Sequence, residues 1–554
     1  MKKVSICLII SLLSINLIAQ DTTILPNQLE FAQRTYSQIL AIPSPRKGSS
    51  CYDTDNNCLR IYDGSTWRCT TSTASAGFND ATGCCTGAYT AGNNLPGGPP
   101  AITLPIAFNQ SAAFNNELYE VGHCPGTAAG LVYYGFGTNF ISTNAKDIGF
   151  VSKYDANGTN LWLAAMHHYS SSAVTTVNAV KSNATGVYII GTFTNNFTIA
   201  TPTATTLTSA GGTDIFVMKL DAATGAFVWA KQFGGAGNDT GVDLTFGESG
   251  FIYFTGMSSG LTIGYCSPSP GVFVGKLNQG TGASIGDGGV INDPISSSLT
   301  ISSILFYNSK VLLIGSFVGS AYPAYVVPCA GSFGVSGTSL TGTAGREIYI
   351  SSFDTNLIPT TYKMVYAGND SGDQLNPFRA TIEGGLSGGG YVSKLKICGN
   401  AVGTFSLGSK TINGGGFILT LNLNGSTLPT INEVITLQGG SFTGFGDGYA
   451  VGICSSASSS INTSASFGGS TGQNFMLSTN VSGFFNWVIT SNMLTGTSGG
   501  LGTQSTKTVS KLCGKVFAFG AYTNAIQLCN TTLDAGTRNH AFWWQYNECG
   551  GCCN

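Results

Sequence analysis

The chain has 554 residues, a net charge of −2 and only 9% charged residues. A nucleic-acid partner needs a basic surface to neutralise its phosphates, so this charge balance argues against one. The 76 glycines are typical of many short strands joined by turns, and an apolar content of 42% is too high for a disordered polar chain.

Residues 1–19 have the pattern of a secretory signal peptide. Lys2 and Lys3 supply its positive charge, and the apolar run from Val4 to Ile18 is shorter than a membrane-spanning helix. No later stretch is apolar enough to span a bilayer, so we expect no membrane-spanning segment in the mature chain. The pattern predicts an exported protein, at the cell surface, outside the cell or in the periplasm.

The cysteines indicate an oxidising compartment. The signal peptide contains one of the 16, and an odd number remains, which leaves one thiol free or shared between molecules. Cys549-Gly-Gly-Cys552 also has the spacing of a zinc site, but no second pair of this kind is present, and export favours disulfides. We therefore predict no metal site there. The disulfide candidates gather toward the two ends of the chain: Cys51, Cys58, Cys69, Cys84, Cys85, Cys549, Cys552 and Cys553.

Residues 20–82 are expected to form a small β module that contains cysteines. Within it, residues 20–42 predict one short helix or strand, and residues 48–70 predict three short strands that need disulfides as support. The segment CYDTDNNCLRIYDGSTWRC is similar to a small module at the front of exported bacterial surface proteins. Residues 83–100 are rich in Gly and Pro and indicate a linker.

Residues 101–554 contain a six-residue pattern that occurs seven times. It begins with Phe or Tyr, has an apolar second and a polar fourth residue, and ends in Asp or Asn. Gly follows a few residues after most copies, which predicts a strand and then an Asx turn. The copies are FVSKYD from Phe150, FVMKLD from Phe216, FVGKLN from Phe273, YISSFD from Tyr349, FILTLN from Phe417, FMLSTN from Phe475 and FWWQYN from Phe542.

Three further strands accompany each copy. The strand before it ends in a small residue and an aromatic one, as in VYYGF at 132–136 and NTSASF at 462–467. Four strands repeated seven times predict a seven-bladed β-propeller, and an array of β-sandwiches is the alternative. Because the chain ends soon after the last copy, we predict that an N-terminal strand at 101–108 pairs with 540–547 and closes the ring. This closure would bring the terminal cysteines together, so we predict a disulfide between the Cys84–Cys85 region and the C-terminal cysteines.

The pattern is clearest in residues 187–246. There the chain reads VYIIGTF and, after a gap, TDIFVMKLDAATGAFVWAKQFGGAGNDTGVDLTF. Together with the other copies, this resembles the seven-bladed bacterial β-propeller repeat (SBBP) family over about residues 110–547. The resemblance implies an exported repeat protein, often at the cell surface, without family-wide catalytic residues.

Polar loops at the blade junctions are the candidate ligand site, on one face around the central channel. Their carboxylates and amides would bind a calcium ion or a polar ligand such as a glycan. The alternative is that Asp239 and Asp370 accept hydrogen bonds from backbone N–H groups and hold the turns. We favour this alternative because the repeat pattern itself contains the Asp, and no loop has the spacing of a calcium loop. The candidates are Asn238, Asp239, Asn369, Asp370, Asp447, His167 and His168.

No catalytic residues are predicted. Glu117 and Glu120 lie three residues apart on a predicted inner strand of the first blade, so they point to opposite faces. We predict a non-catalytic surface or secreted interaction protein, such as an adhesin or a protein that binds glycans or other proteins. No cofactor other than calcium is expected. The alternatives are a polysaccharide lyase or hydrolase on the same scaffold and a structural subunit of an envelope assembly.

Overall fold

The computed structural model divides into two compact units, Met1–Gly77 and Phe78–Asn554. It describes residues 23–25, 28–30, 33–47, 49–53, 58–62, 67–69, 85–88 and most of 106–547. The gaps in this last range are 127–131, 137–138, 144–145, 168–172, 200–204, 249, 260–270, 286–288, 293–298, 319–323, 329–337, 341–344, 366–371, 388–389, 408–409, 424–428, 456–457, 462–464, 469–470, 480–484, 495–502, 513–514, 529–530 and 535–539.

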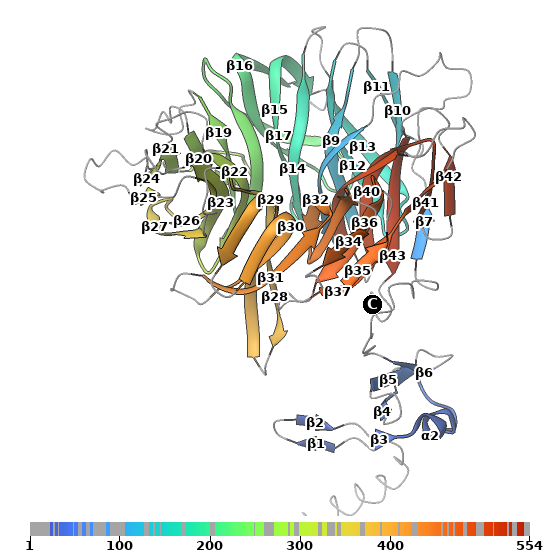
Figure 1. Ribbon diagram of the computed structural model, residues 1–554. Coiled ribbons are helices and arrows are strands. Elements are labelled where there is room, and N and C mark those ends of the chain that lie inside the picture. The colour runs from blue at the N-terminus through green and yellow to red at the C-terminus, as the bar shows by residue number, and fades with distance from the viewer. Residues whose placement is uncertain are drawn as a thin grey trace, which may run out of the picture. The chain divides into compact units, whose positions relative to one another are not determined.

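The first unit contains a two-stranded sheet, a four-stranded sheet and one short helix (Figure 1). Helix α2 (Tyr36–Leu40) begins at Thr35, which starts a capping box that satisfies the first free N–H groups of the helix. Ile39, Cys51 and Trp67 form a buried core. The last three strands are those that the sequence predicts here. The strands are β1 (Thr23–Leu25), β2 (Gln28–Glu30), β3 (Gln33–Arg34), β4 (Ser50–Asp53), β5 (Cys58–Tyr62) and β6 (Trp67–Cys69).

The second unit consists mainly of antiparallel four-stranded groups, which we number in chain order (Figure 1). The repeated six-residue pattern lies in, or ends one residue beyond, the third strand of each group. Group 1 is β8 (Ala107–Phe114), β9 (Glu117–Cys124), β12 (Ile148–Asp155) and β13 (Asn160–Met166); group 2 is β14 (Thr175–Asn183), β15 (Gly186–Ile199), β16 (Thr205–Leu220) and β17 (Phe227–Phe233); group 3 is β18 (Thr240–Phe246), β19 (Phe251–Ser258), β20 (Gly271–Asn278) and β21 (Gly289–Asn292); group 4 is β22 (Thr300–Tyr307), β23 (Lys310–Val318), β26 (Arg346–Asp354) and β27 (Pro359–Val365); group 5 is β28 (Gln374–Ser387), β29 (Gly390–Leu407), β30 (Lys410–Asn422) and β31 (Thr430–Gln438); group 6 is β32 (Gly440–Gly446), β33 (Tyr449–Cys454), β36 (Asn474–Thr479) and β37 (Phe485–Thr490); group 7 is β39 (Thr503–Leu512), β40 (Lys515–Thr523), β43 (His540–Asn547) and β7 (Cys85–Ala88).

Shorter strands extend these groups or form separate hairpins. Two of them continue group 3 beyond β21, and two more continue group 5 beyond β31. The other strands form a hairpin and a three-stranded sheet. They are β24 (Ala324–Pro328) and β25 (Thr338–Leu340), β34 (Ser458–Ile461) and β35 (Ala465–Gly468), β10 (Val132–Phe136) and β11 (Asn139–Thr143), and β38 (Asn492–Leu494), β41 (Ala525–Leu528) and β42 (Thr531–Asp534).

Each group packs on the next through a buried apolar cluster. The third strands are buried at nearly every position, as in β12 and β26, because both faces of a middle sheet are covered. The last group packs on the first in the same way: Phe108 and Phe150 share a cluster with Phe517 and Trp543, and the ring centroids of Phe108 and Phe519 lie 5.9 Å apart. The predicted apolar pattern of the strands is therefore confirmed.

The prediction that a strand at 101–108 closes the last group is wrong. Residues 85–88, placed in a linker by their composition, form β7 and pair with β43, where Cys85 lies opposite Tyr546. Residues 107–114, which overlap the predicted closing strand, instead form the first strand of group 1. A Gly- and Pro-rich composition marks turns but does not prevent a four-residue strand whose backbone completes a sheet.

The predictions of two second strands, VYYGF at 132–136 and NTSASF at 462–467, are also wrong. VYYGF forms β10, which pairs with β11, and the strand paired with β12 is β9. Residues 465–468 form β35, and the strand paired with β36 is β33. Both errors arise because an inserted hairpin also carries the small-residue and aromatic pattern. Glu117 and Glu120 consequently lie on a second strand and not on an inner one.

Candidate ligand-binding cavity

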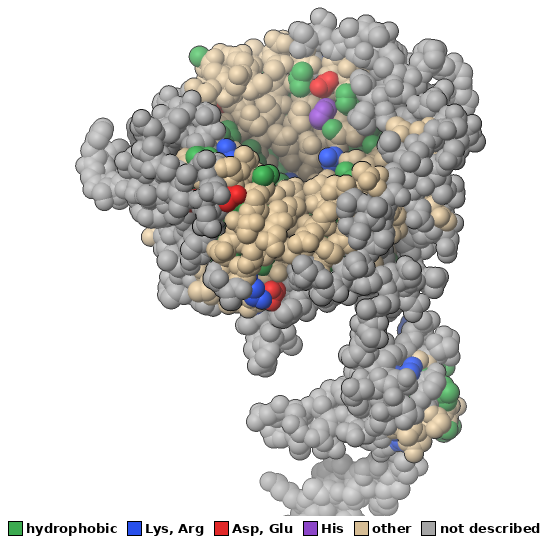
Figure 2. Space-filling model, viewed as in Figure 1, with side chains coloured by type: hydrophobic (Ala, Val, Ile, Leu, Met, Phe, Trp, Pro, Cys, Tyr) green, Lys and Arg blue, Asp and Glu red, His purple; other side chains and the backbone are tan. Residues whose placement is uncertain are grey.

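The first strands of the groups line two cavities. Cavity A, of about 540 Å³, lies where β8, β14, β18, β28, β32 and β39 run toward their ends, and cavity B, of about 720 Å³, lies near the beginnings of β18, β22 and β28. Figure 2 shows one face hollowed at its centre, with Lys or Arg side chains on the wall of the hollow. These volumes lie in the range of about 300–1,000 Å³ that is typical of small-molecule sites.

A buried polar network connects the first strands next to both cavities. The Arg379 guanidinium lies 3.6 Å from the Asp243 carboxylate, and Gln110 donates to the same carboxylate oxygen at 3.4 Å. The other oxygen of Asp243 accepts from the backbone N–H of Ile304 at 3.2 Å, and Gln110 accepts from that of Val180 at 2.6 Å. The network therefore joins β8, β14, β18, β22 and β28, and Arg379 contributes to the walls of both cavities.

Cations predominate in the wall of cavity A. It contains Lys181, Arg379, Lys507 and Lys511, and Asp447 is the one acidic residue that the structure describes there. The carboxylate of Asp447 accepts a hydrogen bond from Ser510 Oγ at 3.2 Å and one from the Lys511 backbone N–H at 3.0 Å. Cavity A therefore presents positive charge, while its carboxylate already has partners.

A buried ion pair lies close to Asp447. Lys396 Nζ is 2.6 Å from Glu383 Oε2 and 2.7 Å from Thr479 Oγ1. Burial raises the pKa of Glu383, against the effect of Lys396, and burial lowers the pKa of Lys396. A Cβ added at Gly448 would meet the Glu383 carboxylate at 3.0 Å, so this carboxylate lies against the residue that follows Asp447. No local sequence pattern indicates this pair, because its members lie on different strands.

A second buried carboxyl group lies behind the wall of cavity A. Glu120 has no exposed surface, and Thr508 Oγ1, on a strand of group 7, donates to it at 2.9 Å. Burial raises its pKa well above the usual value. Glu117, three residues earlier, points to the other face, where it pairs with Lys153 at 2.6 Å. The opposite orientation expected from their spacing is therefore confirmed, and the two carboxyls do not form one site.

The predicted loop residues Asn238 and Asp239 hold a turn. Asp239 is buried and accepts from the backbone N–H groups of Gly235 at 2.9 Å and Ser259 at 3.1 Å. Asn238 accepts from the backbone N–H of Thr213 at 3.2 Å. This geometry corresponds to the alternative in which the Asp supports the blade junction. A calcium ion would have to compete with these N–H groups.

The other predicted site residues do not gather around Asp239. Asp447 was expected in an equivalent loop, but it lies in the turn between β32 and β33 and lines cavity A. Asp239 precedes β18, and the first residues of β18 line cavity B. The two therefore belong to opposite ends of the first strands. His167 is exposed after β13. Asn369, Asp370 and His168 lie outside the described residues.

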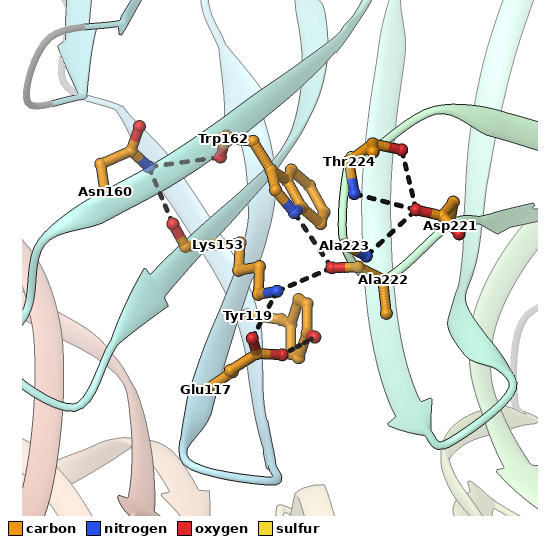
Figure 3. Close-up of polar contacts among 9 residues, drawn as sticks. All are labelled: Glu117, Tyr119, Lys153, Asn160, Trp162, Asp221, Ala222, Ala223 and Thr224. Atoms are coloured by element: carbon orange, nitrogen blue, oxygen red, sulfur yellow. Dashed lines mark hydrogen bonds and ion pairs between the residues drawn. The ribbon is translucent and has the colours of Figure 1, made fainter.

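Lys at the fourth position of the six-residue pattern and Trp on the strand that follows it contact the next group (Figure 3), and we call this arrangement a clasp. Lys153 Nζ donates to the carbonyl oxygen of Ala222 at 2.7 Å, and Trp162 Nε1 donates to the same oxygen at 3.2 Å. Ala222 belongs to the turn that follows β16, and Asp221 holds this turn by accepting from the backbone N–H groups of residues 223 and 224. The pattern thus encodes the attachment of one group to the next.

Related clasps recur at other junctions. Trp229 Nε1 donates to the Gln279 carbonyl at 3.1 Å, and Lys276 Nζ donates to that of Thr355 at 3.1 Å. At the junction of the last and first groups, Lys515 Nζ donates to the Ala156 carbonyl at 2.6 Å. Four tryptophans of the second unit are buried, Trp162, Trp229, Trp543 and Trp544, while the Trp487 side chain lies outside the described part.

The described cysteines include more unpaired thiols than expected. Cys124, Cys398 and Cys454 are buried and form no disulfide within the described structure, and burial raises the pKa of each thiol. The odd cysteine number required only one. Of the disulfide candidates, Cys51 is buried, and the side chains of Cys58, Cys69 and Cys85 and the whole of Cys84, Cys549, Cys552 and Cys553 lie outside what the structure describes.

No group of three or more His, Cys, Asp or Glu side chains among the described residues could hold a metal ion. No helix within the same residues is long and apolar enough to cross a membrane.

Comparison with known proteins gives similar solved structures but shows no family for the chain. No family model and no curated protein matches it. Among solved structures, it is similar to quinohemoprotein alcohol dehydrogenase from Comamonas testosteroni, with 11% identity and a TM-score of 0.32 over 81% of this chain and 78% of that one. It is also similar to a GH43_12 protein retrieved from a capybara gut metagenome, with 10% identity and a TM-score of 0.21 over 92% and 96%. What is established is a nearly all-β protein built from antiparallel sheets.

Proposed function

We propose that this protein is an exported, seven-bladed β-propeller of the SBBP type that acts as a non-catalytic interaction protein. The proposal for the fold is supported by the repeated third strand, by the packing of each group on the next and by the shared cluster of the last and first groups. The signal-peptide pattern of residues 1–19 supports export. Adhesion or glycan binding would be the task of the second unit.

The binding role rests on one observation, which is the polar wall of cavity A. Hydroxyl and cationic side chains from several first strands converge there, including those of Ser182, Thr381 and Thr443. The network around Asp243 holds β8, β14, β18 and β28, so the part of the wall that these strands form is preorganised. A polar wall with many donors suits a ligand that is rich in oxygen, such as a glycan.

The test uses the mature protein and a panel of immobilised polysaccharides, and it scores both retention and newly formed chain ends. Retention without new ends is the expected result. Absence of both retention and new chain ends for every polysaccharide would contradict glycan binding and would favour a protein partner.

A hydrolase or lyase is the second candidate, and the cluster of Glu383, Lys396 and Asp447 favours it. A carboxyl with a raised pKa beside another carboxylate is the arrangement that general acid–base catalysis requires. New chain ends that disappear in Glu383→Gln, with retention unchanged, would replace the non-catalytic proposal with this one.

A further inference from the structure

We propose that cavity A recognises the acidic group of an anionic glycan, an inference that rests on the proposed binding function. Few residues of this protein are charged, so the places where charged residues gather are informative. Only 9% of its residues are charged, and the net charge is −2, so an excess of positive charge in one place is not a consequence of composition.

Elsewhere in the described structure, several cations pair with carboxylates. Lys153 pairs with Glu117 at 2.6 Å, Lys276 with Glu248 at 2.9 Å and Lys410 with Glu433 at 2.7 Å. Two buried lysines have neutral partners instead: Lys394 Nζ donates to Asn432 at 3.2 Å, and Lys219 Nζ lies 5.3 Å from the centroid of the Tyr188 ring. These cations occur singly, so several cations in the wall of one cavity are a distinct feature.

Cavity A gathers cations that lack this compensation. Half-buried Lys181 on β14 and exposed Lys507 on β39 both line it, and neither has an ion-pair partner among the described residues. Arg379 adds a guanidinium whose Nη1 makes no hydrogen bond to a described residue, although Asp243 lies 3.6 Å away. An anion entering the cavity would contact the two lysines and be attracted by the charge of Arg379, whose Nη1 is buried. Charge-assisted hydrogen bonds to a carboxylate are among the stronger polar contacts.

The acidic groups near the cavity offset only part of this charge. Asp447 accepts from Ser510 and from the Lys511 backbone, and these neutral donors leave its negative charge in place. Glu120, behind the wall, has a pKa raised well above the usual value, which favours its uncharged form. Four cations line the wall against the one carboxylate that the structure describes there, so positive charge is in excess.

Hydroxyl groups in the wall suit the remainder of a sugar. Ser111, Thr443 and Ser510 line cavity A, as do Ser182 and Thr381. The hydroxyl oxygens of Ser182 and Thr381 are buried and have no partner in the described part of the chain, so these two side chains must rotate before they can donate to a ligand. A cavity of about 540 Å³ takes the end or a short segment of a glycan chain rather than a long one.

The experiment compares two probes that differ only in charge: oligomers of galacturonic acid and the same oligomers with every carboxylate methyl-esterified. Calorimetric titration of the full mature protein measures both. We expect the acidic oligomer to bind at least about tenfold more tightly than the ester, and its affinity to fall as salt rises from 50 to 500 mM, as screening predicts. Lys181→Gln and Lys507→Gln should each weaken the acidic oligomer by about fivefold.

The matched control is Lys231→Gln, which removes the same charge from an exposed position on β17, outside cavity A. It should leave the affinity unchanged, and unchanged thermal unfolding of all three variants shows that they fold. Equal binding of the acid and the ester, insensitive to both cavity variants, would overturn the acidic specificity while leaving glycan binding intact. If neither oligomer binds, and no polysaccharide of the panel retains the protein or gains new chain ends, both the proposed function and this inference are overturned.

Discussion

Gly225 shows how a single residue enables the clasp between groups. Its φ of +72° lies in the left-handed region, and the turn that it ends presents the Ala222 carbonyl to Lys153 and Trp162. A Cβ there would lie 2.7 Å from Trp162 Cε3. The pattern of Asp followed by Gly predicted the turn, but the indole that covers it comes from the preceding group and could not be placed from local sequence.

Gly225→Ala should destabilise the protein by about 2–4 kcal/mol, since the new methyl group adds steric overlap with Trp162 to the backbone strain. The control is Gly250→Ala. Gly250 has a similar φ of +87° but has nothing within 4 Å of the added Cβ, so only the backbone cost of about 1 kcal/mol is expected. Urea denaturation measures both. Equal losses in the two variants would mean that contact with Trp162 is unimportant.

Glu120 should make stability depend on pH. Burial raises its pKa above the value of 4.5 expected when unfolded, so the folded protein keeps a proton that the unfolded chain releases above that pH. The unfolded state then binds fewer protons, and stability falls as pH rises from about 4.5 toward the folded pKa, by at most about 1.4 kcal/mol per pH unit. Glu120→Gln imitates the protonated side chain and cannot lose this proton.

The free energy of unfolding of Glu120→Gln should therefore rise relative to the unsubstituted protein between pH 5 and pH 7. Urea titrations at several pH values give the difference curve. Parallel curves for the two proteins would show that Glu120 is ionised in the folded state as it is in the unfolded one.

At the scale of elements, the clasp explains why Lys and Trp recur in the pattern. Lys153 is 4% exposed and serves both the Ala222 carbonyl and the Glu117 carboxylate. Lys153→Met would leave a carboxylate without its partner, and because Glu117 is partly exposed, solvent would compensate in part. We expect a loss of about 1–3 kcal/mol in urea denaturation, part of which Lys153→Met with Glu117→Gln recovers. A double variant no better than the single one would contradict the role of the ion pair.

The six-residue pattern predicted the third strands well, because the residues that define it lie next to one another in the sequence. Phe, Lys and Asp in six residues specify a buried strand, its polar contact and its turn. The second strand of group 1 could not be found in the same way, because the VYYGF hairpin has the expected pattern while β9 does not. The cations of cavity A were missed for a related reason: Lys181, Arg379 and Lys507 are far apart in sequence, and only the packing of the groups brings them to one wall.

At the scale of the whole molecule, the two ends of the second unit meet in one sheet. β7 pairs with β43 through residues 85–88 and 543–546 and covers an edge that would otherwise present unpaired backbone groups. Cys85 lies opposite Tyr546, and Cys549 follows Tyr546 by three residues in the sequence, so a disulfide between the two terminal segments stays a prediction that peptide mapping of the oxidised protein can test.

The importance of β7 can be separated from that of the first unit by two truncations. Removal of the residues up to Gly77 deletes the first unit alone, and removal up to Ala88 also deletes β7. We expect the first truncation to keep the thermal midpoint of the second unit. The second should lower this midpoint by several degrees and promote association in size-exclusion chromatography, because the exposed edge of β43 can pair with another chain. If both truncated proteins unfold at the same temperature and stay monomeric, the contacts in the cluster of Phe108, Phe519 and Trp543 suffice to join the last group to the first without the closing strand.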